Sequence, residues 1–302
     1  MLLELAAIFV NVVLPVFGIA AIGYFLGPKL SLNAPTLSRA AYYVFVPAFI
    51  FHAISTSRVE LKRALLMVVY ITLCHLVFAG MGWAAGRLLG RSREVTAALM
   101  MIAVFGNVGN FGIPLIRFRL GDSALAPATI YFVAISITAF VVCVGAAGWA
   151  KGGRRGAMWS LFKTPALWAT IPGLLVSAGK VELPLVLTRM VGLLAGGMIP
   201  LILLALGLQL SEARKLRIRT DVVVASGLRL IAAPAIAALG AIPLGLGRIE
   251  YAAGILQAGM PAAVLVSIIA IEYDVVPDFV TTTVFFSTLL SLLTLTVLLG
   301  LV

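Results

Sequence analysis

The sequence predicts an all-α membrane protein with ten transmembrane helices, arranged as two inverted five-helix repeats. Apolar stretches of roughly 20 residues recur from end to end, and a series of prolines in the first half returns in the second. The mean hydropathy is +1.15 and only 11% of the residues are charged, whereas a soluble domain carries about 25%. These observations exclude an ordinary soluble protein, and the short connections leave no room for a soluble domain.

Ten apolar segments are long enough to cross a bilayer, for which an α-helix needs about 20 residues. We expect these spans at residues 5–26, 37–56, 64–86, 94–120, 124–149, 162–179, 184–210, 221–246, 251–273 and 277–301. We expect the first span to be retained and not cleaved as a signal peptide, because residues 1–4 carry no Lys or Arg and the apolar run is longer than a signal sequence requires.

The net charge of +11 comes from basic residues that cluster in short loops between the predicted spans. The positive-inside rule places them there, so the charge reports membrane topology and not nucleic-acid binding. Most of the 22 Lys and Arg residues fall in the loops after spans 1, 3, 5, 7 and 9. We therefore expect these loops to be cytoplasmic, with both termini on the outer side of the cytoplasmic (inner) membrane.

The prolines suggest an internal repeat. They are Pro15, Pro47, Pro114 and Pro127 in the first half, and Pro172, Pro200, Pro261 and Pro277 in the second. The successive gaps are 32, 67 and 13 residues, against 28, 61 and 16. Because each half has an odd number of spans, the second half enters the membrane from the opposite side, which makes the repeat inverted. The alternative is that proline is simply frequent in membrane helices.

This repeat divides the chain into three parts. Residues 1–150 form the first five-helix repeat, residues 151–163 form a cytoplasmic linker, and residues 164–302 form the second repeat. The linker is rich in Gly, Lys and Arg, and we interpret it as a plain flexible connection.

Two pentapeptides occupy matching places in the halves. Residues 110–114 read NFGIP and residues 257–261 read QAGMP. Gly-x-Pro interrupts a helix, because proline lacks an N–H group and clashes with the preceding turn. An interruption inside a membrane frees backbone groups that must be satisfied by the protein or by a ligand. Paired interruptions of this kind indicate a transporter's binding site in spans 4 and 9.

The candidate substrate-binding residues surround these interruptions. The amides Asn107, Asn110 and Gln257 are costly in a membrane unless they are hydrogen-bonded or face a hydrated cavity, so they line the site or cap the broken helices. The full set is Asn107, Asn110, Gly112, Pro114, Gln257, Gly259, Pro261, Arg229, Ser136, Ser287 and Thr288. Close helix packing is an alternative for the glycines, and hydrogen bonds within the helix are one for the hydroxyls.

The interruptions also have an electrostatic meaning. The half-helix that begins after each one points its N-terminus, with about half a positive charge, into the membrane centre. Free N–H groups at such an end favour anions. This favours an anionic substrate, although a cation can use the opposing C-terminal ends.

Few ionisable residues lie inside the spans. Arg229 either pairs with a substrate carboxylate or extends its long side chain to the membrane interface. His75 is a candidate for proton coupling, with a hydrogen-bonded structural role as the alternative. The sequence lacks mid-membrane carboxylate pairs, metal-ligand spacings and catalytic motifs. We therefore expect no cofactor, no metal site and no enzymatic activity.

Residues 107–114 read NVGNFGIP, Val46-Pro47 lies in span 2, and residues 260–262 read MPA in span 9. With these motifs the chain resembles the auxin efflux carrier family, in its bacterial branch of malonate- and malate-type carriers. The resemblance implies a scaffold of spans 1, 2, 6 and 7 and a moving transport unit of spans 3–5 and 8–10. It also implies that Asn110, Pro114 and Pro261 are crossover residues of the substrate site.

The function expected from these features is secondary active transport of a small organic anion or weak acid by elevator-like alternating access. The expected partners are the substrate, membrane lipids and a second copy bound through the scaffold helices. The chain lacks the long central hydrophilic loop of the plant auxin exporters. Two alternatives stay open, namely a Na⁺-coupled carrier similar to the bile-acid symporters, which share this architecture, and a channel.

Overall fold

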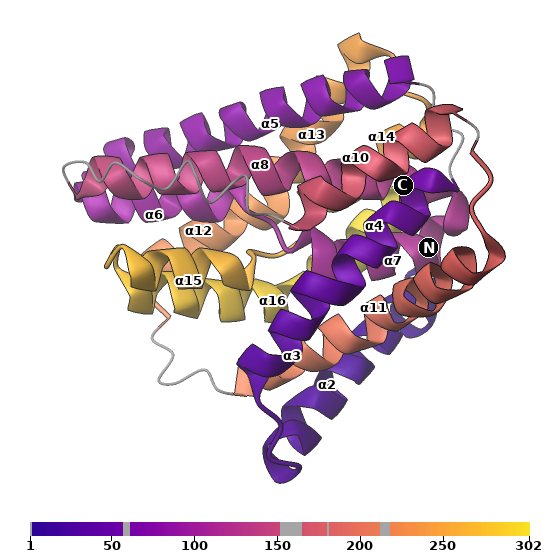
Figure 1. Ribbon diagram of the computed structural model, residues 1–302. Coiled ribbons are helices and arrows are strands. Elements are labelled where there is room, and N and C mark those ends of the chain that lie inside the picture. Colours follow the sequence, from indigo (N-terminus) through magenta and orange to yellow (C-terminus); the bar gives the residue numbers. More distant parts are fainter. Residues whose placement is uncertain (1, 57–60, 152–164, 180, 212–217) are drawn as a thin grey trace.

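The computed structural model describes residues 2–56, 61–151, 165–179, 181–211 and 218–302 (Figure 1). Within these residues the secondary structure is helical, apart from one pair of bridging residues. The predicted all-α fold is thus confirmed for the described part of the chain. The predicted linker at 151–163 lies outside it, except for Lys151.

The first half supplies helices at each of its five predicted spans. In chain order these are α1 (Leu2–Ile8), η1 (Phe9–Val13) and α2 (Leu14–Lys29); α3 (Ala34–Ala40), η2 (Ala41–Phe45) and α4 (Val46–Ser55); α5 (Leu61–Leu88); α6 (Arg93–Val104), η3 (Val108–Gly112) and α7 (Ile113–Leu120); and η4 (Asp122–Ala124) with α8 (Leu125–Ala150).

The second half does the same. Its helices are α10 (Pro165–Gly179); α11 (Leu185–Ser211); α12 (Thr220–Gly227), η5 (Leu228–Ala232), α13 (Ala233–Ala241) and η6 (Ile242–Leu244); α14 (Arg248–Ala258) and α15 (Val264–Glu272); and α16 (Pro277–Leu301).

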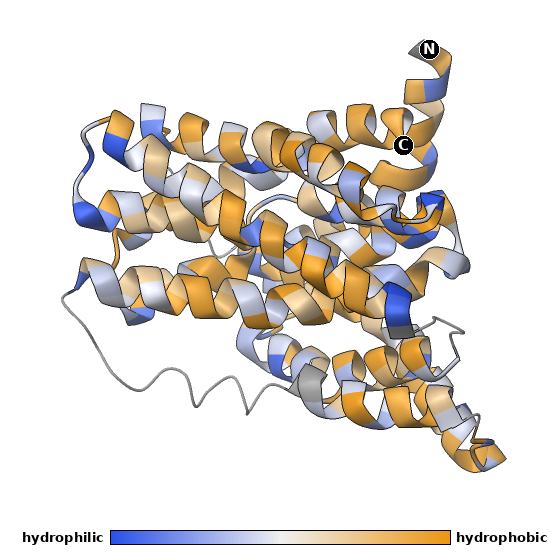
Figure 2. Ribbon diagram, turned by 90° about the horizontal axis from the view of Figure 1, so that it is seen from above, coloured by the Kyte–Doolittle hydropathy of each residue, from blue (hydrophilic) through white to orange (hydrophobic). Residues whose placement is uncertain are grey.

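Within the described residues, 7 helical stretches are long and apolar enough to cross a membrane. They correspond to predicted spans 1, 2, 3, 5, 7, 8 and 10. Span 6 is a shorter apolar helix, and spans 4 and 9 are interrupted. Large apolar side chains cover much of the exterior, for example Leu175 and Leu193, which are 67% and 79% exposed. Figure 2 shows the same predominance of hydrophobic ribbon. Such a surface suits lipid and not water, so the protein is a multi-pass membrane protein.

Four prolines follow wide π-helical turns. The turns η1, η2, η3 and η5 each end two residues before a proline, namely Pro15, Pro47, Pro114 and Pro234. In η3 the N–H of Ile113 donates to the carbonyl of Val108, five residues back. Pro114 has no N–H for the carbonyl four residues before it. The wider turn moves that carbonyl away from the proline ring, so the helix runs on through Pro114.

One prediction about the helix interruptions is therefore wrong in its position. The interruption in span 4 lies between Val104 and Val108, not at Pro114, because η3 and α7 form one continuous helical stretch. In span 9 the chain leaves the helix after Ala258 and re-enters it at Val264, so Pro261 lies in the interruption as predicted. Both spans are broken, but the two pentapeptides are not structurally equivalent.

The helices pack in two groups (Figure 1). In the first, α11 packs along α2 and α4, and α10 packs on α4. Gly23 and Gly207 lie where α2 and α11 cross, and a Cβ atom at either position would collide with backbone of the other helix. This close approach is typical of small residues at membrane helix contacts.

The second group has its own hydrophobic core, built from residues of α5, α6, α8 and α12 to α16. Its members belong to predicted spans 3–5 and 8–10. A further core cluster joins the two groups, because residues of α2, α4 and α11 pack with η3, α7 and the first turns of α8. The interface between the groups is thus partly apolar.

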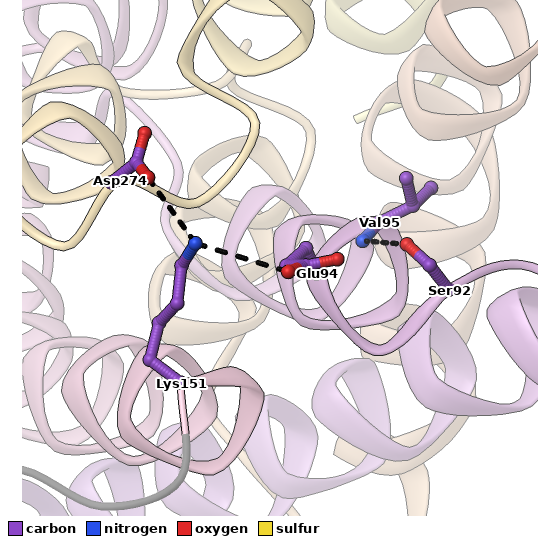
Figure 3. A network of polar contacts seen from close by, with 5 residues as sticks. All are labelled: Ser92, Glu94, Val95, Lys151 and Asp274. Atoms are coloured by element: carbon purple, nitrogen blue, oxygen red, sulfur yellow. Dashed lines mark hydrogen bonds and ion pairs between the residues drawn. The ribbon is translucent and has the colours of Figure 1, made fainter.

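A polar network joins three segments of the second group at one end (Figure 3). Lys151, which follows α8, places Nζ 3.3 Å from Asp274 Oδ2 and 3.8 Å from Glu94 Oε1. Ser92 caps α6 by accepting a hydrogen bond of 3.3 Å from the Val95 N–H. Exposed ion pairs contribute about 0–1 kcal/mol each. The network therefore contributes little to the stability of the fold.

Candidate substrate site at the helix crossover

The two interrupted segments pair with each other. The N–H of Asn107 donates to the carbonyl of Pro261 at 2.7 Å, and the N–H of Ala263 donates to the carbonyl of Phe105 at 2.9 Å. The residues between them form an antiparallel bridge. Each interruption thus satisfies part of the other's backbone, as a membrane interior requires. Four half-helix ends meet here: α6 and α14 end, while η3 and α15 begin.

Arg229 binds the ends of both α6 and α14. Its side chain is 0% exposed and lies in η5. It donates to five backbone carbonyls, those of Ala103 (2.7 Å), Val104 (3.5 Å), Gln257 (3.4 Å), Ala258 (2.8 Å) and Met260 (2.8 Å). Helix C-terminal carbonyls carry partial negative charge, so the guanidinium compensates both ends at once.

This position contradicts one of the two roles considered for Arg229. A fully buried side chain at the crossover does not extend to the membrane interface. The other role, pairing with a substrate carboxylate, would require the carbonyls to give up donors that they now hold. The sequence placed Arg229 inside a predicted span. It gave no sign that η5 contacts the ends of two other helices.

Two further residues fix the guanidinium plane. The ring of Phe78 lies with its centroid 5.9 Å from the Arg229 Cζ atom, close enough for a cation–π interaction. Gly106 lies on the guanidinium, and a Cβ atom there would come within 2.8 Å of Cζ. A glycine is therefore required at 106 so that the extended segment can approach the arginine.

The opposite ends, where η3 and α15 begin, face open space. The first N–H groups of a helix have no partner within the helix. The residues that carry them, Val108, Gly109 and Asn110 in η3 and Val264 and Leu265 in α15, line a single cavity of about 590 Å³. Both half-helices thus direct their N-termini to the same space.

Polar side chains from several segments also line this cavity. Asn107 and Asn110 come from the crossover, Ser38 and Arg39 from α3, Ser136 from α8, and Gln209 from α11. Asn107 is 5% exposed, and within the described residues its Nδ2 atom has no hydrogen-bond partner. Asn110 is half-buried. The cavity therefore offers amide donors beside the helix N-termini.

The walls of the cavity are apolar and come from both helix groups. The apolar lining side chains include Val46, Phe132, Phe140, Ile202, Leu265 and Ile268. The sequence alone did not indicate Gln209, Ser38 and Phe140 as lining residues. Gln209 donates to Ser38 at 2.8 Å, but a lone amide near the end of span 7 gives no sign of which cavity it borders.

The other predicted site residues lie deeper. Gln257 is 0% exposed, donates to the carbonyl of Ala128 at 3.3 Å and packs on Gly112. Its Oε1 atom has no partner among the described residues. Gly259 packs on Leu298. The predicted residues Gly112, Gln257 and Gly259 are not among those that line the cavity, and neither is the buried Pro114.

The hydroxyls differ in role. Ser287 accepts a hydrogen bond of 3.2 Å from the N–H of Ala262 and so satisfies a backbone donor of the interrupted segment. Thr288 and Ser136 donate to carbonyls four residues back in their own helices, at 2.7 Å and 2.6 Å. For these two the intrahelical alternative describes the observed contact, and Ser136 still reaches the cavity wall.

His75 is buried away from the cavity. Its Nδ1 atom lies 2.6 Å from the carbonyl of Ile71, and Phe78 and Tyr131 pack edge-on to its ring. A carbonyl only accepts hydrogen bonds, so Nδ1 carries the proton. The Nε2 atom has no partner within the described residues. These contacts fit the structural role, and proton coupling through His75 stays a prediction.

A helical membrane protein in which two interrupted helices cross beside a cavity with amide groups in its lining has the architecture of a membrane transporter. Residues 8–152 and 154–299 match the family described as Membrane transport protein. The chain therefore belongs to this family, that of the auxin efflux carriers, and is a transport protein and not an enzyme.

Similar proteins occur in bacteria and archaea. An "Uncharacterized transporter" of Methanothermobacter thermautotrophicus is 29% identical over 94% of this chain and 95% of its own. A protein of Rhizobium meliloti named "Putative malonate transporter" is 28% identical over 97% of this chain and 95% of its own. An uncharacterized transporter of Methanocaldococcus jannaschii is 24% identical over 94% and 95%.

The role of Ser287 can be tested by removing its hydroxyl. We expect Ser287→Ala to lower the free energy of unfolding by about 1–3 kcal/mol, because the Ala262 N–H is left buried without an acceptor. Thermal unfolding of the purified protein in detergent measures this. Thr288→Val is the matched control, since it removes only a hydroxyl that bonds its own helix. Equal losses in the two variants would show that Ser287 does not support the crossover.

Proposed function

We propose that the protein is a secondary active transporter that moves a small organic anion or weak acid across the cytoplasmic membrane. One observation carries the proposal: the N-termini of two half-helices open into the same cavity, beside the Nδ2 of Asn107, which has no partner among the residues that the structure describes. Each N-terminus carries about half a positive charge. Free N–H groups and amide donors at one place favour a carboxylate.

The opposite ends of the crossover support an anion over a cation. A substrate cation would bind best at the C-terminal carbonyls of α6 and α14. Arg229 already donates to these carbonyls. The partial negative charge of the C-terminal helix ends is therefore compensated by Arg229, whereas the partial positive charge of the N-terminal ends of η3 and α15 is available to an anion.

The cavity walls suit a short hydrocarbon between polar groups. Phe132, Phe140 and Leu265 supply apolar contacts, while Asn107 and Asn110 supply donors. The name of the Rhizobium meliloti relative specifies malonate, a short dicarboxylate. We infer a substrate of this class for the present chain, and the Na⁺-coupled carrier similar to bile-acid symporters is the alternative.

The mechanism we infer is elevator-like alternating access, in which the group of α5–α8 and α12–α16 moves against α1–α4, α10 and α11. The cavity at the crossover lies between these groups. A second cavity, of about 600 Å³, lies at the same interface and is lined by His52, Thr56, Ala195, Arg117 and Asp122, among others. The two cavities share no lining residue. Separate cavities favour alternating access over a channel.

The predicted orientation assigns each cavity to one side of the membrane. With the loops after spans 1, 3, 5, 7 and 9 in the cytoplasm, the crossover cavity faces the cytoplasm and the second cavity faces outward. In this proposal both termini lie on the outer side of the inner membrane. The first helix group serves as a static scaffold in contact with lipid and provides the contact for a homodimer.

The amide of Asn110 tests the substrate site. We expect Asn110→Ala to reduce malonate uptake into proteoliposomes about 10- to 100-fold, since a hydrogen bond to a charged group contributes about 1.5–3 kcal/mol. The matched control is Asn11→Ala, which replaces an exposed asparagine in η1, another π-helical turn before a proline. Equal uptake by both variants would remove Asn110 from the site.

The movement can be tested with disulfide cross-links in a chain whose Cys74 and Cys143 are replaced by alanine. Phe17 of α2 and Phe111 of η3 belong to different groups, and their ring centroids lie 4.8 Å apart. We expect a cross-link between cysteines at these positions to stop uptake, because it ties the scaffold to the moving group.

Reduction of this cross-link should restore uptake, which separates the effect of the bond from that of the substitutions. The control pair is Arg91→Cys with Asp221→Cys. Both positions lie within the moving group, and the native Arg91 Nε and Asp221 Oδ1 atoms are 2.8 Å apart. Oxidation of this pair should leave uptake intact. Full uptake with the Phe17–Phe111 pair cross-linked would contradict an elevator-like movement.

A further inference from the structure

We propose that Arg229 is a built-in counter-cation, occupying a cation site formed by the carbonyl ends of α6 and α14. In this role it holds the crossover together without a bound Na⁺ or other free cation. The inference concerns the crossover's own stability, and it does not depend on which substrate the protein carries.

The arrangement of charges leads to this assignment. The ends of α6 and α14 meet at the crossover with their carbonyls toward Arg229. Each helix end carries about half a negative charge, so two of them present about one unit of negative charge. One guanidinium balances it. Among the described residues, the hydrogen-bond partners of Arg229 are all backbone carbonyls and include no carboxylate.

Without this cation the crossover would be costly. Carbonyls at the centre of a membrane protein have no water to bind, and an unsatisfied buried carbonyl is destabilising. Two negative helix ends facing each other would also repel. A cation coordinated by these carbonyls would remove both costs, which is the role that a coupling Na⁺ plays at interrupted helices of other transporters.

Arginine is suited to this position for geometric reasons. Its planar guanidinium has five N–H donors in a fixed fork, so it can reach carbonyls of two helices at the same time. Gly106 and Phe78 pack against the guanidinium. A lysine would retain the charge but bind fewer of the carbonyls. The cation in this site is therefore part of the protein chain, and its occupancy does not vary with the ions in solution.

The experiment measures thermal unfolding of the purified full-length protein in detergent, without substrate. The wild-type melting temperature should be the same in NaCl, KCl and choline chloride at equal ionic strength. Arg229→Gln should lower it, because the carbonyls lose the charge and most of the donors. A guanidinium ion should then bind the vacated carbonyls and raise the melting temperature of this variant by about 3–6 °C at ten times its Kd.

Two controls isolate the site. Urea at the same concentration has a similar planar shape but no charge, so it should give no recovery. Arg93→Gln is the matched variant: Arg93 also places Cζ 5.9 Å from an aromatic centroid, that of Trp149, but it is exposed. Guanidinium should not raise the melting temperature of this variant.

Several results would overturn the assignment. They are an Arg229→Gln protein as stable as wild type, equal recovery with urea, and a wild-type protein that Na⁺ stabilises. If Arg229→Gln yields no folded protein, Arg229→Lys decides. Folded Arg229→Lys shows that the positive charge is what the crossover requires, whereas loss of this variant too shows that the fork geometry alone matters and refutes the counter-cation. None of these outcomes alters the uptake test of Asn110.

Discussion

The absence of water at the centre of a membrane is the constraint on which the structure of this protein depends. Interrupting two helices there exposes backbone groups at four helix ends. The two extended segments satisfy some of these groups by pairing with each other, and Ser287 satisfies one more. Arg229 satisfies the carbonyls of α6 and α14. The N-terminal ends of η3 and α15 are left, and they border the cavity. The proposed binding of an anion follows from this uneven distribution.

Prolines shape the helices around this crossover in two ways. Pro261 lies in an interruption, while Pro114 lies in a continuous helix behind a π-helical turn. Another such turn, η5, carries Arg229 into the crossover. A wide turn changes the direction in which a side chain leaves the helix without breaking it. Proline therefore interrupts the helix of span 9 at one place. At another, it follows the wide turn that directs the buried Arg229 toward this interruption.

The sequence was sufficient to predict the class of protein, because length and hydropathy determine which segments can span a membrane. It also indicated both interrupted spans, and two of the residues that it named as site candidates, Asn107 and Pro261, pair with each other at the crossover. It misplaced the interruption in span 4, since a local motif does not reveal that a π-helical turn can accommodate Pro114. The role of Arg229 and the contribution of Gln209 depend on contacts between residues far apart in the chain, for which a single sequence carries no signal.

The most direct test of the account is anomalous diffraction from crystals soaked with a bromine-labelled dicarboxylate such as bromomalonate. The account predicts a bromine peak in the crossover cavity, with a carboxylate within hydrogen-bond distance of the N–H groups of residues 108–110 or 264–265. It also predicts that Arg229 keeps its bonds to the carbonyls of Ala103 and Ala258. A carboxylate bound to the Arg229 guanidinium, with those carbonyls released, would contradict it.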